Sequence, residues 1–223
     1  MLSGLPVIAI DGPSGTGKST LASSVARRLK MTQIDTGALY RAASWLVLER
    51  GVDPSDSDAV AACVAAAEFS YGPELLIDGK APGDLRSPEI NKVVSHVAAV
   101  PAVRTHLVAV MRRRAEQLGG TVMEGRDIGS VVFPDAVVKV YLEADPDVRA
   151  RRRLAEEHDA GRHHLDHGAV LETLVERDRL DSTREIAPLT VAPGAIRLDS
   201  SMASVEELTD LVVDLYREAL AQA

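Results

Sequence analysis

Five short hydrophobic runs recur along the chain and indicate buried β-strands. Their hydrophobic residues are continuous and do not alternate with polar ones, which is typical of parallel strands covered on both faces. Segments with helical spacing, or longer insertions, separate the runs. We therefore predict an α/β fold with a single five-stranded parallel sheet. The predicted strands are residues 7–10, 33–35, 121–124, 137–143 and 195–199.

Polar residues and glycines gather where each of these runs ends. The clusters begin at Gly12, Asp35, Glu124, Glu143 and Asp199. The carboxyl ends of parallel strands lie along one edge of a sheet, and open α/β sheets bind their ligands there. The pattern therefore predicts a ligand site at this edge.

Two stretches interrupt the regular alternation of strand and helix. Residues 42–120 are too long for one crossover helix, and they include two short apolar runs, 69–71 and 75–77, which predict a small hairpin with Asp78-Gly79 as its turn former. Residues 149–167 begin as an arginine-bearing helix, and we expect them to form a short flap over bound phosphates. Helical spacing within the first stretch covers residues 42–49, 58–67, 88–97 and 103–118.

These interruptions divide one predicted domain, residues 1–223, into three parts. We expect a core that carries the sheet, an inserted α+β lobe and a small lid. The predicted core is residues 1–41, 121–148 and 168–223, the insertion is residues 42–120, and the lid is residues 149–167.

The segment Gly12-Pro13-Ser14-Gly15-Thr16-Gly17-Lys18-Ser19 matches the phosphate-binding loop pattern GxxxxGK[ST]. A predicted strand precedes it, and residues 19–30 follow with helical spacing, as the motif requires. The glycines let successive N–H groups turn around phosphate oxygens, Lys18 reaches the outer phosphates, and the Ser19 hydroxyl can ligate Mg²⁺. The motif predicts binding of a nucleoside triphosphate.

Composition narrows the ligand to a small molecule. The chain has 223 residues, a formal net charge of -8 and 3% aromatic residues. Its acidic charge does not suit neutralisation of a nucleic acid backbone, and it has few aromatic rings on which bases could stack.

The single Cys63 cannot form an intrachain disulfide, which suits a reducing compartment. No apolar run reaches the roughly 18 residues of a membrane span. We expect a cytoplasmic protein without a membrane or nucleic acid partner, and a monomer by default.

Several classes of protein carry a phosphate loop, and other residues of the chain indicate which class is meant. A guanine-specific switch protein should carry Asn-Lys-x-Asp, but Asn91-Lys92-Val93-Val94 lacks the aspartate. Guanidinium groups suit phosphate oxygens, and in an acidic chain their concentration behind the predicted ligand edge favours a second, phosphorylated substrate. The arginines concerned are Arg41, Arg126, Arg151, Arg152, Arg153, Arg177, Arg179 and Arg184.

Four blocks of sequence closely resemble the bacterial cytidylate kinase family. They are the phosphate loop, then Asp35-Thr36-Gly37-Ala38-Leu39-Tyr40-Arg41, then Glu124-Gly125-Arg126-Asp127-Ile128-Gly129 with residues 131–136, and finally Glu176-Arg177-Asp178-Arg179 with Arg184 and residues 187–189. The resemblance runs from the first predicted strand to the last. It implies a nucleoside monophosphate kinase fold with a core sheet, a lid and an enlarged monophosphate-binding lobe.

The resemblance also implies an activity. The chain would use ATP, with Mg²⁺, to phosphorylate CMP and dCMP to the diphosphates, and UMP would be a poor acceptor. The phosphoryl group would pass directly, in line, to an acceptor oxygen that is already anionic.

Site residues are carried over by position. Gly12, Pro13, Ser14, Gly15, Thr16, Gly17, Lys18, Ser19 and Thr20 would bind ATP, with Lys18, Arg126, Arg184 and the lid residue Arg153 acting in catalysis. Thr36, Arg41, Arg126 and Arg184 would hold the acceptor phosphate, Ser95, Arg104 and Asp127 would contact cytosine, and Arg177 and Asp181 would contact the sugar. Ser19 would ligate the metal directly and Glu124 through water.

The sequence departs from the family pattern at three of these positions. Thr36 stands where serine is common, Glu124 stands where aspartate is frequent, and the surroundings of Asp181 are less acidic than in the family.

Two alternative functions remain open at this point. One is another small-molecule kinase with a phosphate loop, of the UMP/CMP, adenylate or shikimate type. The other is a non-catalytic nucleotide-binding regulator. His158, His163, His164 and His167 also raise the possibility of a metal site, but flanking glycines favour solvent-facing residues in a flexible lid.

Overall fold

The computed structural model describes residues 5–71, 74–159, 161–163 and 165–222. The chain divides into two compact units. The sheet unit comprises the residues up to Ile34 and those from Gly119 onward, and the insertion unit comprises Asp35–Leu118. The proposed functional division into core, insertion and lid stays a prediction.

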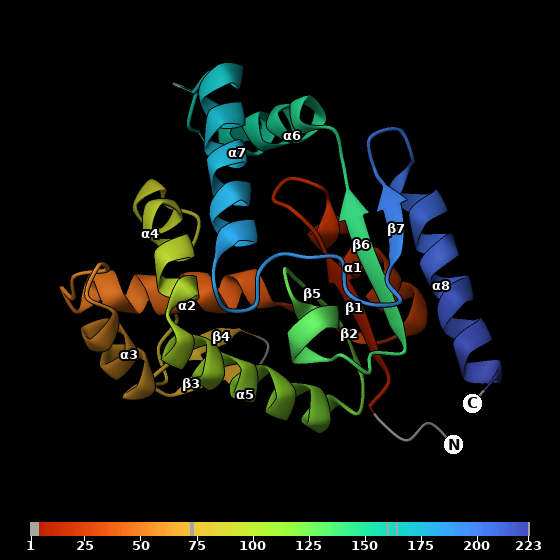
Figure 1. Cartoon of the computed structure of the whole chain (residues 1–223), viewed down its shortest axis with the longest axis horizontal. Coiled ribbons are helices and arrows are strands. Elements are labelled where there is room, and N and C mark those ends of the chain that lie inside the picture. The colour runs from red at the N-terminus through yellow and green to blue at the C-terminus, as the bar shows by residue number, and fades with distance from the viewer. Residues whose placement is uncertain (1–4, 72–73, 160, 164, 223) are drawn as a thin grey trace. The chain divides into compact units, whose positions relative to one another are not determined.

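The sheet unit is built on five strands in the order β2-β5-β1-β6-β7 (Figure 1). β1 lies at the centre and pairs in parallel with β5 and β6, and β6 pairs in parallel with β7. This arrangement confirms the predicted α/β class and its five-stranded sheet. The strands are β1 (Val7–Asp11), β2 (Thr32–Asp35), β5 (Thr121–Gly125), β6 (Val138–Glu143) and β7 (Ile196–Asp199).

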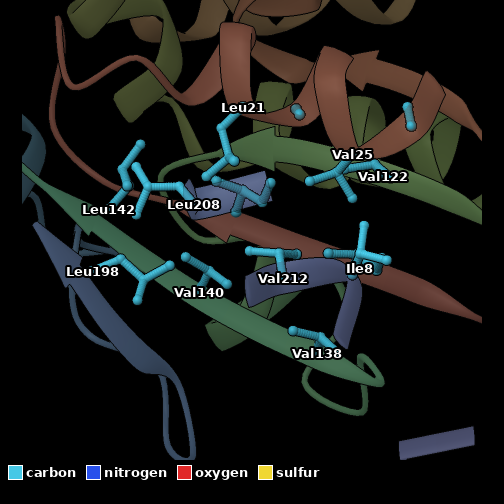
Figure 2. Close-up of a cluster of buried hydrophobic side chains, with 14 residues drawn as sticks. Ile8, Leu21, Val25, Val122, Val138, Val140, Leu142, Leu198, Leu208 and Val212 are labelled. Carbon is cyan, nitrogen blue, oxygen red and sulfur yellow. The ribbon is translucent and has the colours of Figure 1, made fainter. Parts of the chain in front are cut away.

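Helices α1 (Lys18–Leu29) and α8 (Val205–Ala221) pack against each other and cover one face of this sheet. Figure 2 shows Leu21 and Val25 of α1 and Val212 of α8 in one cluster with the strand residues Ile8 and Val140. These side chains are buried, and removing their apolar surface from water stabilises the layer. The strand ends that carry the phosphate loop therefore rest on a rigid support.

Three further elements complete the sheet unit. A π-helical turn, η1 (Ile128–Val132), follows β5. Helices α6 (Pro146–Asp159) and α7 (His167–Thr183) pack against each other around the buried residues Ala150, Val170 and Leu174.

The described residues of the insertion unit form four helices and one antiparallel hairpin. Its helices α2 and α4 pack together, as do α3 and α5. The predicted hairpin is present, with Phe69 opposite Ile77. The elements are α2 (Thr36–Glu49), α3 (Ser57–Ala65), β3 (Phe69–Tyr71), β4 (Leu75–Ile77), α4 (Pro88–Ala99) and α5 (Pro101–Leu118).

Two local predictions for the insertion unit were wrong. Helix α2 begins at Thr36, six residues before the predicted start, because the Asp35 side chain accepts a hydrogen bond of 3.0 Å from the Ala38 N–H and caps the helix. Asp78-Gly79 does not connect the two hairpin strands, whose link includes residues outside the described range. With positive φ angles of 50° and 74°, this pair instead turns the chain after β4.

Among the described residues, no single helix has both the length and the apolar composition of a membrane span. Helices α4 and α5 meet these criteria only as a pair, and they are bent by 95° at the break between them.

Candidate nucleotide-binding site

The phosphate loop connects β1 to α1 and passes very close to β6. Gly12 has a φ of 150°, and a β-carbon there would lie 2.1 Å from the backbone oxygen of Leu142. Gly15 and Gly17 also have positive φ angles, of 77° and 88°, which L side chains rarely adopt. The glycines of the motif therefore shape the loop and allow its close approach to β6.

Lys18 lies at the first residue of α1, where the N–H groups of the first turn face the loop. Its ammonium group is buried and donates a hydrogen bond of 2.5 Å to the Pro13 oxygen. Gly17, at the N-cap, has no side chain with which to cap the helix. The positive end of the helix dipole and the Lys18 ammonium group therefore lie close together, and this arrangement suits a bound anion.

Burial and neighbouring cations lower the pKa of Lys18 to about 7. Burial has the largest effect, and Arg126 and Arg177 add to it. Glu124 and Asp11 oppose the shift but do not cancel it. An anion bound beside Lys18 would oppose this shift, because it favours the charged form of the ammonium group.

Two side chains from α6 and α7 fix the loop at Ser14. Arg149 donates to the Ser14 oxygen over 3.2 Å and forms an ion pair with Asp178. The Asp178 carboxylate in turn accepts from the Ser14 N–H over 3.4 Å. One ion pair thus contacts both sides of the same loop residue.

A second arginine fixes the loop at Thr16. Arg152 donates to the oxygen and the hydroxyl of Ser200, over 2.6 and 3.0 Å. The buried Ser200 hydroxyl then donates to the Thr16 oxygen over 2.8 Å. Ser200 follows β7 and was not among the predicted site residues; its position just after a strand end is the only sequence signal that could have indicated it.

Arg153, the predicted catalytic lid residue, has other partners. It pairs with Glu156 over 3.0 Å and with Glu157 over 2.5 Å, both on its own helix. Glu157 is buried and also pairs with Arg162. Of the lid arginines, Arg149 and Arg152 therefore contact the loop, and the catalytic role of Arg153 stays a prediction.

Ser19 and Glu124 are joined by Gln33 of β2. The Gln33 amide nitrogen lies 3.1 Å from Oε1 of Glu124 and 3.4 Å from Oγ of Ser19. A hydroxyl and a buried carboxylate fit Mg²⁺, which is usually held by one or two protein oxygens together with phosphates and water. Gln33 was not among the predicted site residues, because an amide in a short strand carries no motif.

Asp11 is a further residue that the sequence analysis did not assign. Its two carboxylate oxygens accept hydrogen bonds of 2.8 and 2.7 Å from the N–H groups of Ile128 and Gly129. Burial raises the pKa of Asp11 to about 6, although these bonds lower it. Asp11 thereby ties the start of the phosphate loop to the segment that follows Arg126 and Asp127.

Five predicted acceptor-binding residues lie in the sheet unit, and four of them form a connected set. Arg126 donates to Asp181 over 2.9 Å, and Arg184 lies 4.0 Å from Asp181 and 3.7 Å from Asp127. Burial acts to raise the pKa of Asp181, but Arg126, Arg177 and Arg184 together lower it below its ordinary value. The set is therefore rich in arginine, and the arginines favour the ionised form of Asp181.

The other four predicted acceptor-binding residues lie in the insertion unit. Buried Thr36 is the first residue of α2, and Arg41, one turn later, pairs with Asp35 over 3.0 Å. Ser95 is half-buried on α4. Arg104 of α5 is buried, and its guanidinium carbon lies 5.3 Å from the centre of a tyrosine ring, within cation–π range.

No cluster of three or more His, Cys, Asp or Glu residues that could hold a metal ion occurs in the described part of the chain. The rings of His158 and His163 lie 5.2 Å apart, and His167 lies 3.6 Å from Asp147. His164 lies outside the described residues.

The fold and this loop define an α/β protein with a phosphate loop between its first strand and first helix. A gluconokinase from Sinorhizobium meliloti 1021 has the same fold, with a TM-score of 0.50 and 17% identity, over 98% of this chain and 96% of that one. The match is a likeness of fold alone.

The family follows from sequence comparison. The cytidylate kinase family model matches residues 8–218, and the chain belongs to this family. A cytidylate kinase from Rhodococcus opacus is 45% identical, over 91% of this chain and 90% of its own length. A bifunctional pantoate ligase/cytidylate kinase from Synechococcus sp. WH7803 is also 45% identical, over 97% of this chain, but the chain spans only 46% of that relative.

Proposed function

We propose that the chain transfers the γ-phosphoryl group of ATP to CMP and dCMP, giving CDP and dCDP. The observation that carries this proposal is the end-to-end similarity to a curated cytidylate kinase of nearly the same length. The concentration of positive charge at Lys18 supports it independently, because such a site suits the phosphates of a donor nucleotide.

The proposed chemistry is direct in-line transfer. The acceptor is a phosphate oxygen that is already anionic, so positioning and charge neutralisation are sufficient and a strong general base is unnecessary. Lys18 would stabilise the donor phosphates. Arg126 and Arg184 would follow the negative charge as the phosphoryl group moves, with Arg153 joining them if the lid rearranges.

Acceptor recognition is assigned to residues of both units. In the proposal, Thr36, Arg41, Arg126 and Arg184 hold the phosphate, and Arg177 and Asp181 contact the sugar. Asp127, which is buried, would accept a hydrogen bond from the cytosine amino group, while Ser95 and Arg104 contact the base from the insertion unit. Uracil lacks that amino group and could not donate this hydrogen bond to Asp127, so UMP should be a poor acceptor.

Ser19 and Glu124 are the residues that would hold Mg²⁺, the first directly and the second through water. When bound, the ion would draw negative charge away from the transferring phosphate. We keep the cytoplasm as the predicted location and a monomer as the predicted state.

A coupled assay of ADP release tests the proposal. ATP is supplied with CMP, dCMP, UMP, AMP or shikimate in turn, and we expect turnover with CMP and dCMP to dominate. A profile dominated by another acceptor would favour one of the other small-molecule kinases. Tight ATP binding without transfer to any acceptor would favour a nucleotide-binding regulator.

The same assay tests the two central cations. We expect Lys18→Ala and Arg126→Ala each to lower turnover by at least about a hundredfold, because each removes charge stabilisation that a transition state needs. Arg217→Ala is the matched control, since Arg217 is exposed and pairs with Asp214 on its own helix. Near-normal activity of either variant, with a fold unchanged by circular dichroism, would contradict the assignment.

A further inference from the structure

Gln33 lies between the two residues to which the proposed function assigns the divalent cation. Its amide nitrogen is within 3.1 Å of Oε1 of Glu124, 3.4 Å of Oγ of Ser19 and 3.2 Å of the backbone oxygen of Ser19. We propose that Gln33 is a positioning residue that fixes Glu124 and Ser19 relative to each other and thereby sets the affinity of the nucleotide complex for Mg²⁺. This inference rests on the proposed function.

The strand register gives Gln33 a defined direction. Side chains alternate across a β-strand, and the next residue, Ile34, is fully buried. Gln33 therefore projects to the opposite side of β2. There it meets the end of β5, the neighbouring strand, and the first turn of α1. One amide group thus joins α1 and β2, which are consecutive in the chain, to Glu124 of β5, which lies 91 residues after Gln33.

Charge explains why a neutral donor suits this position. Glu124 interacts electrostatically with Lys18 and with Arg126, and either cation could draw its carboxylate away from a metal. An amide holds one carboxylate oxygen by a hydrogen bond without adding positive charge that would repel Mg²⁺. A lysine or arginine in place of Gln33 would satisfy Glu124 but weaken the metal site.

The contact with Ser19 has a similar consequence. The amide donates to the hydroxyl oxygen, so the hydroxyl hydrogen remains free to rotate and a second lone pair remains available for a metal. Groups that orient metal ligands in this way typically change metal affinity by 10- to 100-fold when they are replaced. The Gln33 side chain is half-buried, which places the expected effect at the lower end.

Metal binding to the complex of the chain with ADP tests the inference without turnover. Mn²⁺, which is visible by electron paramagnetic resonance, serves as the probe. We expect Gln33→Met to weaken Mn²⁺ binding about tenfold, while ADP affinity measured in EDTA stays unchanged. Gln117→Met is the control, because Gln117 is exposed on α5 and contacts Arg114.

A double-mutant cycle with Glu124→Gln separates positioning from a general structural role. Because Gln33 is proposed to act through Glu124 as well as Ser19, Gln33→Met should weaken Mn²⁺ binding less in the Glu124→Gln background than in the unmodified chain. An unchanged Mn²⁺ affinity in Gln33→Met, or an equal loss in both backgrounds, would overturn the inference. Because no acceptor is present, a chain that binds Mn²⁺ as expected but fails to phosphorylate CMP would contradict the proposed function alone.

Discussion

At the scale of single residues, Lys18 shows most directly what the site is built to bind. Its ammonium group is buried beside cations that include Arg126 and Arg177, and its pKa of about 7 leaves it only partly charged at neutral pH. A bound phosphate would return the pKa towards its ordinary value, because the anion favours the charged form. Binding of nucleotide and of a proton should therefore be linked.

We expect binding of MgADP at pH 8 to take up about 0.9 proton, since a group with a pKa of about 7 is then largely neutral in the free protein and charged in the complex. It follows that affinity should fall as pH rises above 7, by close to tenfold per pH unit between pH 8 and pH 9. Isothermal titration calorimetry in buffers of different ionisation enthalpy measures the uptake.

Lys18→Met should bind MgADP weakly and without proton uptake. Lys92→Met is the matched control, because Lys92 is an exposed lysine on α4. Uptake that persists in Lys18→Met would assign the proton to another group.

At the scale of elements, the phosphate loop depends on how closely β1 and β6 allow it to pass. The loop begins at Gly12, directly after β1, and no β-carbon can be accommodated there because the Leu142 oxygen of β6 would lie only 2.1 Å away. A side chain at position 12 would therefore force either β6 or the phosphate loop to move.

We expect Gly12→Ala to lower the free energy of unfolding by more than the roughly 1 kcal/mol that an alanine at a positive φ costs, and to weaken ADP binding at least tenfold. Urea unfolding and calorimetry measure the two effects. Gly194→Ala is the matched control, since Gly194 also has a positive φ, of 75°, but has open space where its β-carbon would lie. Equal losses in the two variants would show that backbone conformation, and not the contact with β6, determines the effect.

At the scale of the whole molecule, the proposal assigns donor contacts to the sheet unit and acceptor contacts to both units. A ligand that binds only the folded state at a concentration a hundred times its Kd stabilises that state by about 2.7 kcal/mol. For a chain of this size we expect a rise in Tm of roughly 5 to 10 °C. Saturating ADP and saturating CMP should each produce it.

The variant Arg104→Met should distinguish the effect of CMP on Tm from the effect of ADP. It should abolish most of the CMP-induced rise in Tm and leave the ADP-induced rise intact, because Arg104 lies in the insertion unit and is proposed to contact only the base of the acceptor. Arg113→Met, an exposed position on the same helix, should keep both rises. Differential scanning fluorimetry checks this, and a full response to CMP in Arg104→Met would contradict the assigned role.

The sequence by itself determined the features that depend on local chemistry and on periodicity. Hydrophobic runs predicted the five strands to within one or two residues. The pattern has its clearest cause in β1 and β5, where every residue is buried, whereas β2 and β7 each have one buried residue. The phosphate loop was equally clear, since its glycines and Lys18 must stand at fixed spacing. The start of α2 was misplaced because Asp35 both ends β2 and caps α2, so the helix follows the strand with no residue between them.

The tertiary structure decided what depends on contacts between distant segments. It showed that Arg149 and Arg152, and not Arg153, contact the loop, because only the packing of α6 beside the sheet selects which side of that helix meets it. It also identified Asp11, Gln33 and Ser200, each of which has a hydrogen-bond partner 91 or more residues away in the chain. A hydrogen bond across such a separation leaves no periodic signal in the sequence, so only the folded chain reveals it.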